Sequence, residues 1–146
     1  ILDQGYQVAT GYRFYALQMN PNALLRMALS LGYRFVFRRL LGIPLHDPET
    51  GYKFFERQTI LKIMQEVQNP GWFWDTEVMC SAFLMRARIL ESPCLFKRRA
   101  DKKTTIRVFQ YTLRHFTELW KFRKKLQARQ MRTEYRTGTV LESTDK

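Results

Sequence analysis

The sequence predicts an α/β fold, and three observations support this. Segments whose apolar residues recur at helical spacing alternate with short segments typical of strands. The composition is globular, with 45% hydrophobic and 26% charged residues in a chain of 146. We expect one domain or part of one, because the strands are too few for a complete sheet. No run of about eighteen uncharged apolar residues is present that would span a membrane.

Seven elements are expected along the chain. Short apolar and aromatic runs bounded by turn residues predict strands at 6–15, 52–55 and 89–96. Apolar residues three and four apart predict helices at 21–41, 60–67 and 75–85, and a long amphipathic C-terminal helix that opens at Thr104 or Thr105. This mixed order of helices and strands is typical of an α/β fold.

Capping residues predict where the helices begin and end. Asn20 followed by Pro21 has the residue types of an N-cap and a first helical position, and Gly42 would stop that helix. Asp75 is expected to cap the third helix. We expect residues 127–146 to form a basic, disordered tail.

The positive charge of the chain is concentrated in its last third. The net charge is +12, from 25 basic and 13 acidic residues, and residues 97–136 alone hold 14 basic and 3 acidic residues. Such a patch favours a polyanionic partner: nucleic acid, anionic lipid or a phosphorylated substrate. The composition alone does not choose among these partners.

The two cysteines, Cys80 and Cys94, form no disulfide framework and lack the spacing of a zinc site. No metal-ligand set is therefore predicted within this chain. This cysteine usage, together with the absence of a secretory signal, predicts a reducing, cytoplasmic setting.

Two pairs of polar residues are candidates for chemistry. Arg26 and Ser30 are four apart on an expected helix, so both could hold one phosphate; the alternative is a solvated polar face. Asp75 and Glu77 lie at an expected helix start beneath aromatic residues, where one could orient an acceptor or act as a base. Helix capping is the alternative for this second pair, and the two roles are compatible.

Two loops are candidates as well. The loop at 45–53 contains Asp47 before a proline, and it is either a turn or an active-site loop that presents a carboxylate. The basic loop at 97–105 precedes a helix N-terminus, which is a natural anion site, although a solvated charge run has the same pattern. Beyond Trp120 the last helix has a basic flank that is suited to an anionic bilayer surface.

Taken in order, these segments resemble the second half of a family-two glycosyltransferase, in the branch of dolichol-phosphate mannose synthases and polyprenyl-phosphate sugar transferases. The resemblance runs from about Tyr6 to Leu126. It is carried by VATGYR at 8–13 (v-x-G-S-R), RMALS at 26–30 (R-x-x-x-S), DPETGYK at 47–53 (D-x-x-S/T-G-F/Y-K/R), FWDTEVM at 73–79 (F-x-D-x-E-L-L) and ILESP at 89–93 (I-x-E-v-P). Residues 99–103 resemble R-x-x-S-K, with Lys102 in place of Ser, and Tyr12 departs from Ser in the first motif.

The resemblance implies the C-terminal part of a GT-A fold, with residues 1–126 as the acceptor-side half. It also implies the inverting transfer of a sugar from a nucleotide sugar to a polyprenyl phosphate at the cytoplasmic face of a membrane. Carried over by position, it assigns the acceptor phosphate to Arg13, Arg26 and Ser30, a diphosphate or phosphate to Arg99 and Lys103, and the catalytic region to Asp47, Asp75 and Glu77.

Relatives in this family hold the nucleotide and a Mg²⁺ or Mn²⁺ ion with an Asp-x-Asp motif on an earlier strand. No Asp-x-Asp occurs in this sequence. We therefore expect a fragment that lacks the nucleotide-binding half and is inactive alone, or else a degenerate relative.

Two other classes of function remain as alternatives. A basic nucleic-acid-binding module would account for the net charge, but no motif of that class is present and the aromatic residues of the last helix fall on its apolar stripe. A non-catalytic membrane-surface module is the second alternative.

Overall fold

The computed structural model describes residues 4–15, 21–96 and 108–142, and it confirms the α/β class. The elements in chain order are β1 (Val8–Tyr15), α1 (Pro21–Leu41), β2 (Lys53–Phe55), α2 (Arg57–Glu66), α3 (Trp74–Leu84), β3 (Ile89–Phe96) and α4 (Val108–Glu142). All seven expected elements are therefore present in the described part of the chain. The predicted N-cap Asn20 and the helix openings at Thr104 or Thr105 lie outside the described residues.

The three strands form one mixed sheet in the order β2-β1-β3. β1 and β3 are parallel over their whole length, from Val8 opposite Ile89 to Tyr15 opposite Phe96. β2 pairs with β1 in the antiparallel direction over only three residues, so the rest of that edge of β1 is left for the loop before β2. Gly11 of β1 donates its backbone N–H to the carbonyl of Tyr52, at the end of this loop.

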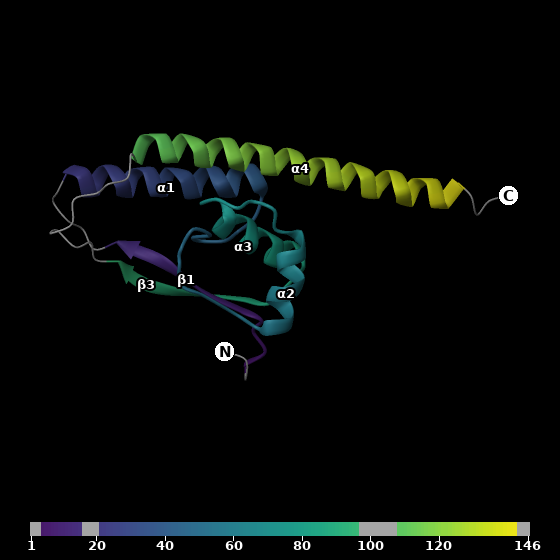
Figure 1. Ribbon diagram of the computed structural model, residues 1–146, viewed down its shortest axis with the longest axis horizontal. Coiled ribbons are helices and arrows are strands. Elements are labelled where there is room, and N and C mark those ends of the chain that lie inside the picture. Colours follow the sequence, from purple (N-terminus) through teal and green to yellow (C-terminus); the bar gives the residue numbers. More distant parts are fainter. Residues whose placement is uncertain (1–3, 16–20, 97–107, 143–146) are drawn as a thin grey trace.

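The helices gather on one side of the sheet (Figure 1). α1 and α4 lie side by side and run in the same direction, and α3 lies between this helix pair and the strands (Figure 1). The segment between β1 and β3, which contains α1, α2 and α3, is a crossover connection. Parallel strands need one, because the chain must return to the same end of the sheet before it forms the second strand.

The core lies where α3 meets the other elements. Seven consecutive residues of α3, from Thr76 to Ala82, are buried. The remaining core side chains come from the strands, the other helices and the loop after α1: Val8, Tyr33, Phe37, Ile43, Leu45, Ile63, Phe73, Leu119 and Phe122. The middle of α3 is thus buried around its circumference, which explains why the helix lacks a one-sided apolar stripe, whereas Asp75 near its start and Leu84 at its end are partly exposed.

Two sequence predictions about helix ends were wrong. Phe73 and not Asp75 holds the N-cap position of α3, and no side chain caps it, because Asp75 lies one residue inside the helix and hydrogen-bonds Lys53 instead. α4 continues to Glu142, although we expected a disordered tail from residue 127. Residues 127–132 are Gln-Ala-Arg-Gln-Met-Arg, all good helix formers, which accounts for this continuation.

A glycine inside α1 and the glycine just after it make a matched test of backbone conformation. Gly42 ends the helix at φ +67°, where it donates its N–H to the Arg38 carbonyl, whereas Gly32 lies inside the helix; an added Cβ meets no atom within 4 Å at either position. Gly32→Ala should therefore stabilise the protein by about 0.5–1 kcal/mol. Gly42→Ala should destabilise it by about 1–2 kcal/mol because of the left-handed φ. Urea unfolding measures the change in the free energy of unfolding for both variants. Changes of the same sign would contradict this explanation.

Candidate functional site

A buried carboxylate joins three elements at the far end of β1. The side chain of Asp47, in the loop between α1 and β2, is fully buried. It accepts hydrogen bonds from the backbone N–H (3.1 Å), Nε (2.6 Å) and Nη2 (2.8 Å) of Arg13 in β1. It also accepts one from Nη2 of Arg34 in α1. Asp47 thus fixes two guanidinium groups in one place.

The electrostatics of this cluster keep Asp47 ionised. Burial alone would raise the pKa of its carboxyl, but the hydrogen bonds and charge of Arg13, together with the charge of Arg34, outweigh burial and hold this pKa below its ordinary value. Its oxygens already accept four hydrogen bonds. This arrangement suits a residue that positions the two arginines, and the catalytic role of Asp47 stays a prediction.

The cluster continues through Glu49 to the last helix. Nη2 of Arg13 lies 3.2 Å from Oε2 of Glu49, and the other carboxylate oxygen of Glu49 lies 3.1 Å from Nδ1 of His115 in α4. His115 also makes an edge-to-face contact with Tyr33 of α1, at 5.7 Å between ring centroids. A residue from α4 therefore reaches the same network as the arginine of β1.

Lys53 and Asp75 form a second pair, which links β2 to the start of α3. Nζ of Lys53 donates to Oδ1 of Asp75 at 2.7 Å and to the carbonyl of Thr50. Burial lowers the pKa of Lys53, although the hydrogen bond and charge of Asp75 oppose this shift. The Lys53 side chain is only 4% exposed, whereas Asp75 is 35% exposed. Asp75 is thus the partner that a bound molecule can reach.

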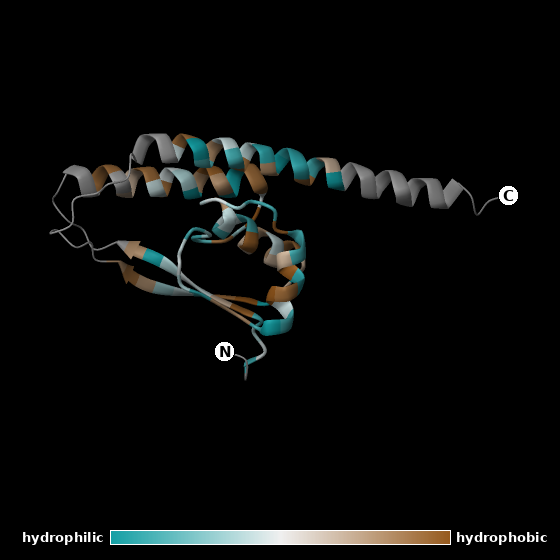
Figure 2. Cartoon of the chain, viewed as in Figure 1, coloured by the Kyte–Doolittle hydropathy of each residue, from teal (hydrophilic) through white to brown (hydrophobic). Residues whose placement is uncertain are grey.

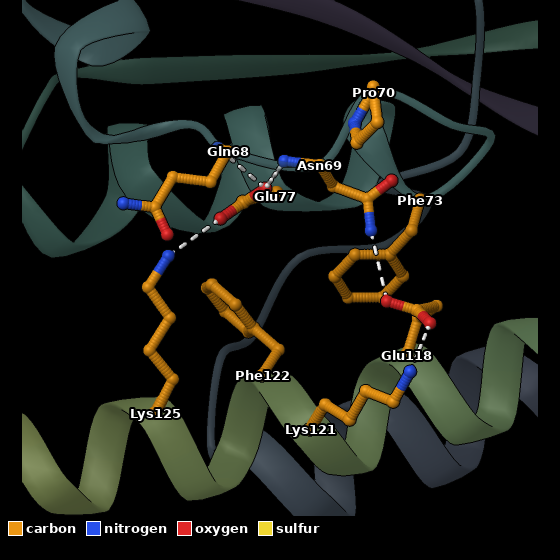
Figure 3. Close-up of a pocket in the computed structure, with 9 residues that line it drawn as sticks. All are labelled: Gln68, Asn69, Pro70, Phe73, Glu77, Glu118, Lys121, Phe122 and Lys125. Carbon is orange, nitrogen blue, oxygen red and sulfur yellow. Dashed lines mark hydrogen bonds and ion pairs between the residues drawn. The ribbon is translucent and has the colours of Figure 1, made fainter.

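Glu77 makes a different set of contacts, shown in Figure 3. It is 3% exposed, and its carboxylate accepts the backbone N–H groups of Gln68 (3.1 Å) and Asn69 (2.7 Å) and pairs with Nζ of Lys125 at 3.1 Å. Helical residues two apart do not share a face, and Asp75 instead contacts β2. The structure therefore does not bring the predicted pair Asp75 and Glu77 together. Glu77 joins the loop after α2 to α4 at a cleft of about 210 Å³.

The other predicted residues are placed only in part. Arg26 and Ser30 both belong to α1, and Ser30 is half-buried, but the side chain of Arg26 lies outside the described residues. Arg99 and Lys103 lie outside the described residues as well. The structure therefore brings Arg13 and Asp47 together, and the phosphate contacts of Arg13, Arg26 and Ser30 stay predictions.

Sequence reasoning missed Arg34, Glu49, Lys53 and His115. A signal for Arg34 was present, because it follows Arg26 and Ser30 at intervals of four, which places all three on one helical face. Glu49 and Lys53 lie inside the motif that we had singled out at 47–53. No local pattern indicates His115, which is distant in sequence from the groups it contacts.

The described part of the chain holds no cluster of metal-ligating side chains. Within residues 4–15, 21–96 and 108–142, no three His, Cys, Asp or Glu side chains gather as metal ligands. Asp47, Asp75 and Glu77 are each paired with a basic side chain. These residues therefore do not fit a Mg²⁺ or Mn²⁺ ion.

Comparison with known proteins gives two curated relatives. No family model matches the chain, and no solved structure matches it. The chain is 29% identical over 101 residues to glycosyltransferase AglD of Haloferax volcanii, a match covering 69% of this chain and 16% of the relative. It is 34% identical over 73 residues to dolichyl-phosphate beta-glucosyltransferase of Saccharomyces cerevisiae, covering 49% of this chain and 21% of the relative.

Both relatives are named as glycosyltransferases, and the similarity of the chain to them supports a glycosyltransferase-like identity. The matches span only about a sixth and a fifth of the length of these relatives. The mixed three-stranded sheet and its helices are consistent with part of a glycosyltransferase domain.

Proposed function

We propose that this chain is the acceptor-side part of an inverting glycosyltransferase, which moves a sugar from a nucleotide sugar to a polyprenyl phosphate at a membrane surface. The proposed domain is the C-terminal part of a GT-A fold over residues 1–126. A nucleotide-binding half, together with the Mg²⁺ or Mn²⁺ ligands, would complete it. The name of the yeast relative, a dolichyl-phosphate glucosyltransferase, supports an acceptor of the lipid-phosphate class.

The observation that carries this proposal is the arrangement of Arg13 and Arg34 on Asp47, because Arg34 belongs to the same helix as Arg26 and Ser30. Guanidinium groups bind phosphate through several donors in a fixed plane, and fixing them in advance reduces the entropy lost on binding. In this proposal Arg13, Arg26 and Ser30 hold the acceptor phosphate, and Arg99 and Lys103 neutralise the donor diphosphate.

The chemistry agrees with this division of roles. A lipid phosphate is ionised near neutral pH, so its attack needs little help from a general base. The harder task is to hold two anionic substrates together, which basic side chains achieve by charge neutralisation and positioning. Asp47 would position the arginines and Asp75 would face the acceptor. Glu77 would keep the loop after α2 against α4, which is a supporting role.

A membrane-facing surface is proposed on α1 and α4. Large apolar residues of both helices are exposed, from 36% for Leu24 to 71% for Phe35 on α1, and 53% for Leu113 and 52% for Trp120 on α4. Hydrophobic and hydrophilic residues alternate along the coloured parts of α1 and α4 (Figure 2). Arginines and lysines on the same helices would contact anionic headgroups at the cytoplasmic face. Within the described residues, no helix has the length and apolar character needed to cross a bilayer.

Arg26→Ala tests the acceptor-phosphate assignment. We expect the affinity for farnesyl phosphate, a short polyprenyl phosphate, to fall by about tenfold or more, because a charge-assisted hydrogen bond contributes about 1.5–3 kcal/mol. Isothermal titration calorimetry measures this affinity. Arg39→Ala is the matched control, because it removes an exposed arginine from the last turn of the same helix. Equal affinities of the Arg26→Ala variant and the unmodified chain would overturn the assignment.

A further inference from the structure

A chain of ionic contacts connects the proposed phosphate site to the last helix. Arg13 of β1 shares the carboxylate of Glu49 with His115 of α4, at 3.2 Å on one oxygen and 3.1 Å on the other. Glu49 is therefore the single carboxylate between an arginine that is always charged and a histidine whose charge depends on pH. Asp47, by contrast, contacts arginines only.

The strength of the contact between His115 and Glu49 depends on the protonation of His115. Nδ1 of His115 is buried and close to Glu49, but it has no hydrogen bond of good geometry. A neutral imidazole therefore holds Glu49 weakly, whereas a protonated one forms an ion pair with it. This pair is partly shielded from water, since the side chains of His115 and Glu49 are only 16% and 21% exposed.

The surroundings of His115 leave Glu49 as its main electrostatic partner. Tyr33 of α1 contacts its ring edge-to-face, and burial raises the pKa of this tyrosine, so Tyr33 stays neutral. Arg114 and Glu118 are its neighbours on α4, and the three residues line a cleft of about 330 Å³ with residues 69–73, which include no titratable side chain. Glu118 is already bonded to Lys121 and Asn69. Behind Glu49 lie Arg13, Asp47 and Arg34.

We infer that His115 is a positioning residue, which through Glu49 sets how much positive charge Arg13 presents to a bound phosphate. The inference rests on the proposed function, because it concerns the same phosphate site. A protonated His115 pairs with Glu49 and compensates the negative charge of that carboxylate. Glu49 then neutralises less of the positive charge of Arg13. When His115 is neutral, Glu49 pairs with Arg13 alone. The affinity for an anionic acceptor should therefore rise as His115 takes up a proton, and acceptor binding should in turn favour that proton.

Farnesyl phosphate binding at about pH 5.5 and about pH 8, on either side of the histidine range, tests this inference. The proteins are the unmodified chain, His115→Gln and His46→Gln. His46 is the matched control, because it is the other histidine of the chain and pairs with a carboxylate, Glu91, at 2.8 Å. The phosphate of the ligand also titrates in this range, but equally for all three proteins, so it cancels in the ratio of affinities.

We expect the unmodified chain and His46→Gln to bind farnesyl phosphate about three- to tenfold more tightly than His115→Gln at the lower pH, and about equally at the higher pH. Binding that is present but whose pH dependence is unchanged in His115→Gln would overturn this inference and leave the proposed function standing. An absence of farnesyl phosphate binding at both pH values would overturn the proposed function, and this inference with it.

A second measurement needs no variant and so does not depend on His115→Gln folding. Nuclear magnetic resonance follows the imidazole signals of His115 at about pH 5.5, with and without farnesyl phosphate. We expect the ligand to shift the signals of His115 and to leave those of His46 unchanged. Unchanged His115 signals in the presence of bound ligand would contradict the proposed coupling.

Discussion

Asp47→Asn should destabilise the fold by about 3–5 kcal/mol, the usual effect of removing one partner from a buried ion pair. Asparagine keeps the size of the side chain but removes the charge that compensates Arg13 and Arg34. The two guanidinium groups would then face each other across a buried amide that cannot accept all four hydrogen bonds. Urea unfolding near pH 7 measures the loss. A difference below about 0.5 kcal/mol, the range of a surface substitution, would show that the cluster does not hold the fold together.

The difference in the free energy of unfolding between the unmodified chain and Asp47→Asn should change with pH in a definite direction. The folded-state pKa of Asp47 lies below its value in the unfolded chain, so its ionisation contributes stability that is fully present above the unfolded pKa of about 3.9. This contribution is lost as the pH falls through the folded-state pKa of Asp47. There the carboxylate of the unmodified chain becomes neutral, as the amide of the Asp47→Asn variant already is. The gap between the unmodified chain and Asp47→Asn should therefore narrow in acid.

Glu77→Ala should destabilise the fold by about 2–4 kcal/mol. The substitution leaves the part-buried backbone N–H groups of Gln68 and Asn69 without their acceptor, and a hydrogen bond to a charged group contributes about 1.5–3 kcal/mol. It also removes the pairing of Lys125 with the buried carboxylate. Because these contacts connect the loop after α2 to α4, hydrogen exchange of the Gln68 and Asn69 amides should become faster in the variant.

Glu66→Ala is the matched control for Glu77→Ala. Glu66 also pairs with a basic residue of α4, Arg129, but both side chains are largely exposed, at 38% and 54%. Such a surface pair contributes about 0–1 kcal/mol. Equal losses in the two variants would mean that burial of Glu77 and its bonds to the loop amides add nothing.

The sequence alone was sufficient for the fold class and the order of elements, because both depend on local patterns. The apolar spacing of α1 and the Gly42 stop are confirmed, since a helix and its end are decided within a few residues. The start of α3 was misplaced by local reasoning, because the cap preference of Asp75 is weaker than its contact with Lys53. Tertiary contacts of this kind override single-residue preferences.

The candidate site was predictable only where one motif contains its residues. Asp47 was found because of its motif, but its partners come from β1 and α1, so the pairing with Arg13 and Arg34 required the fold. Glu77 was singled out with Asp75 because they are close in sequence. The structure separates them, since residues two apart lie on different faces of a helix. His115 shows the limit most clearly, because its contact with Glu49 joins segments that no local pattern connects.

The central claim is that this chain binds a lipid phosphate as a glycosyltransferase acceptor. The most direct test compares undecaprenyl phosphate with undecaprenol in identical detergent micelles, with calorimetry as the readout, and includes a single-stranded oligonucleotide as a competing polyanion. We expect the lipid phosphate to bind at least about tenfold more tightly than the alcohol, because basic side chains contact the phosphate. We also expect that the oligonucleotide does not displace the lipid phosphate. Equal affinities for the two lipids, or tighter binding of the oligonucleotide, would contradict the claim.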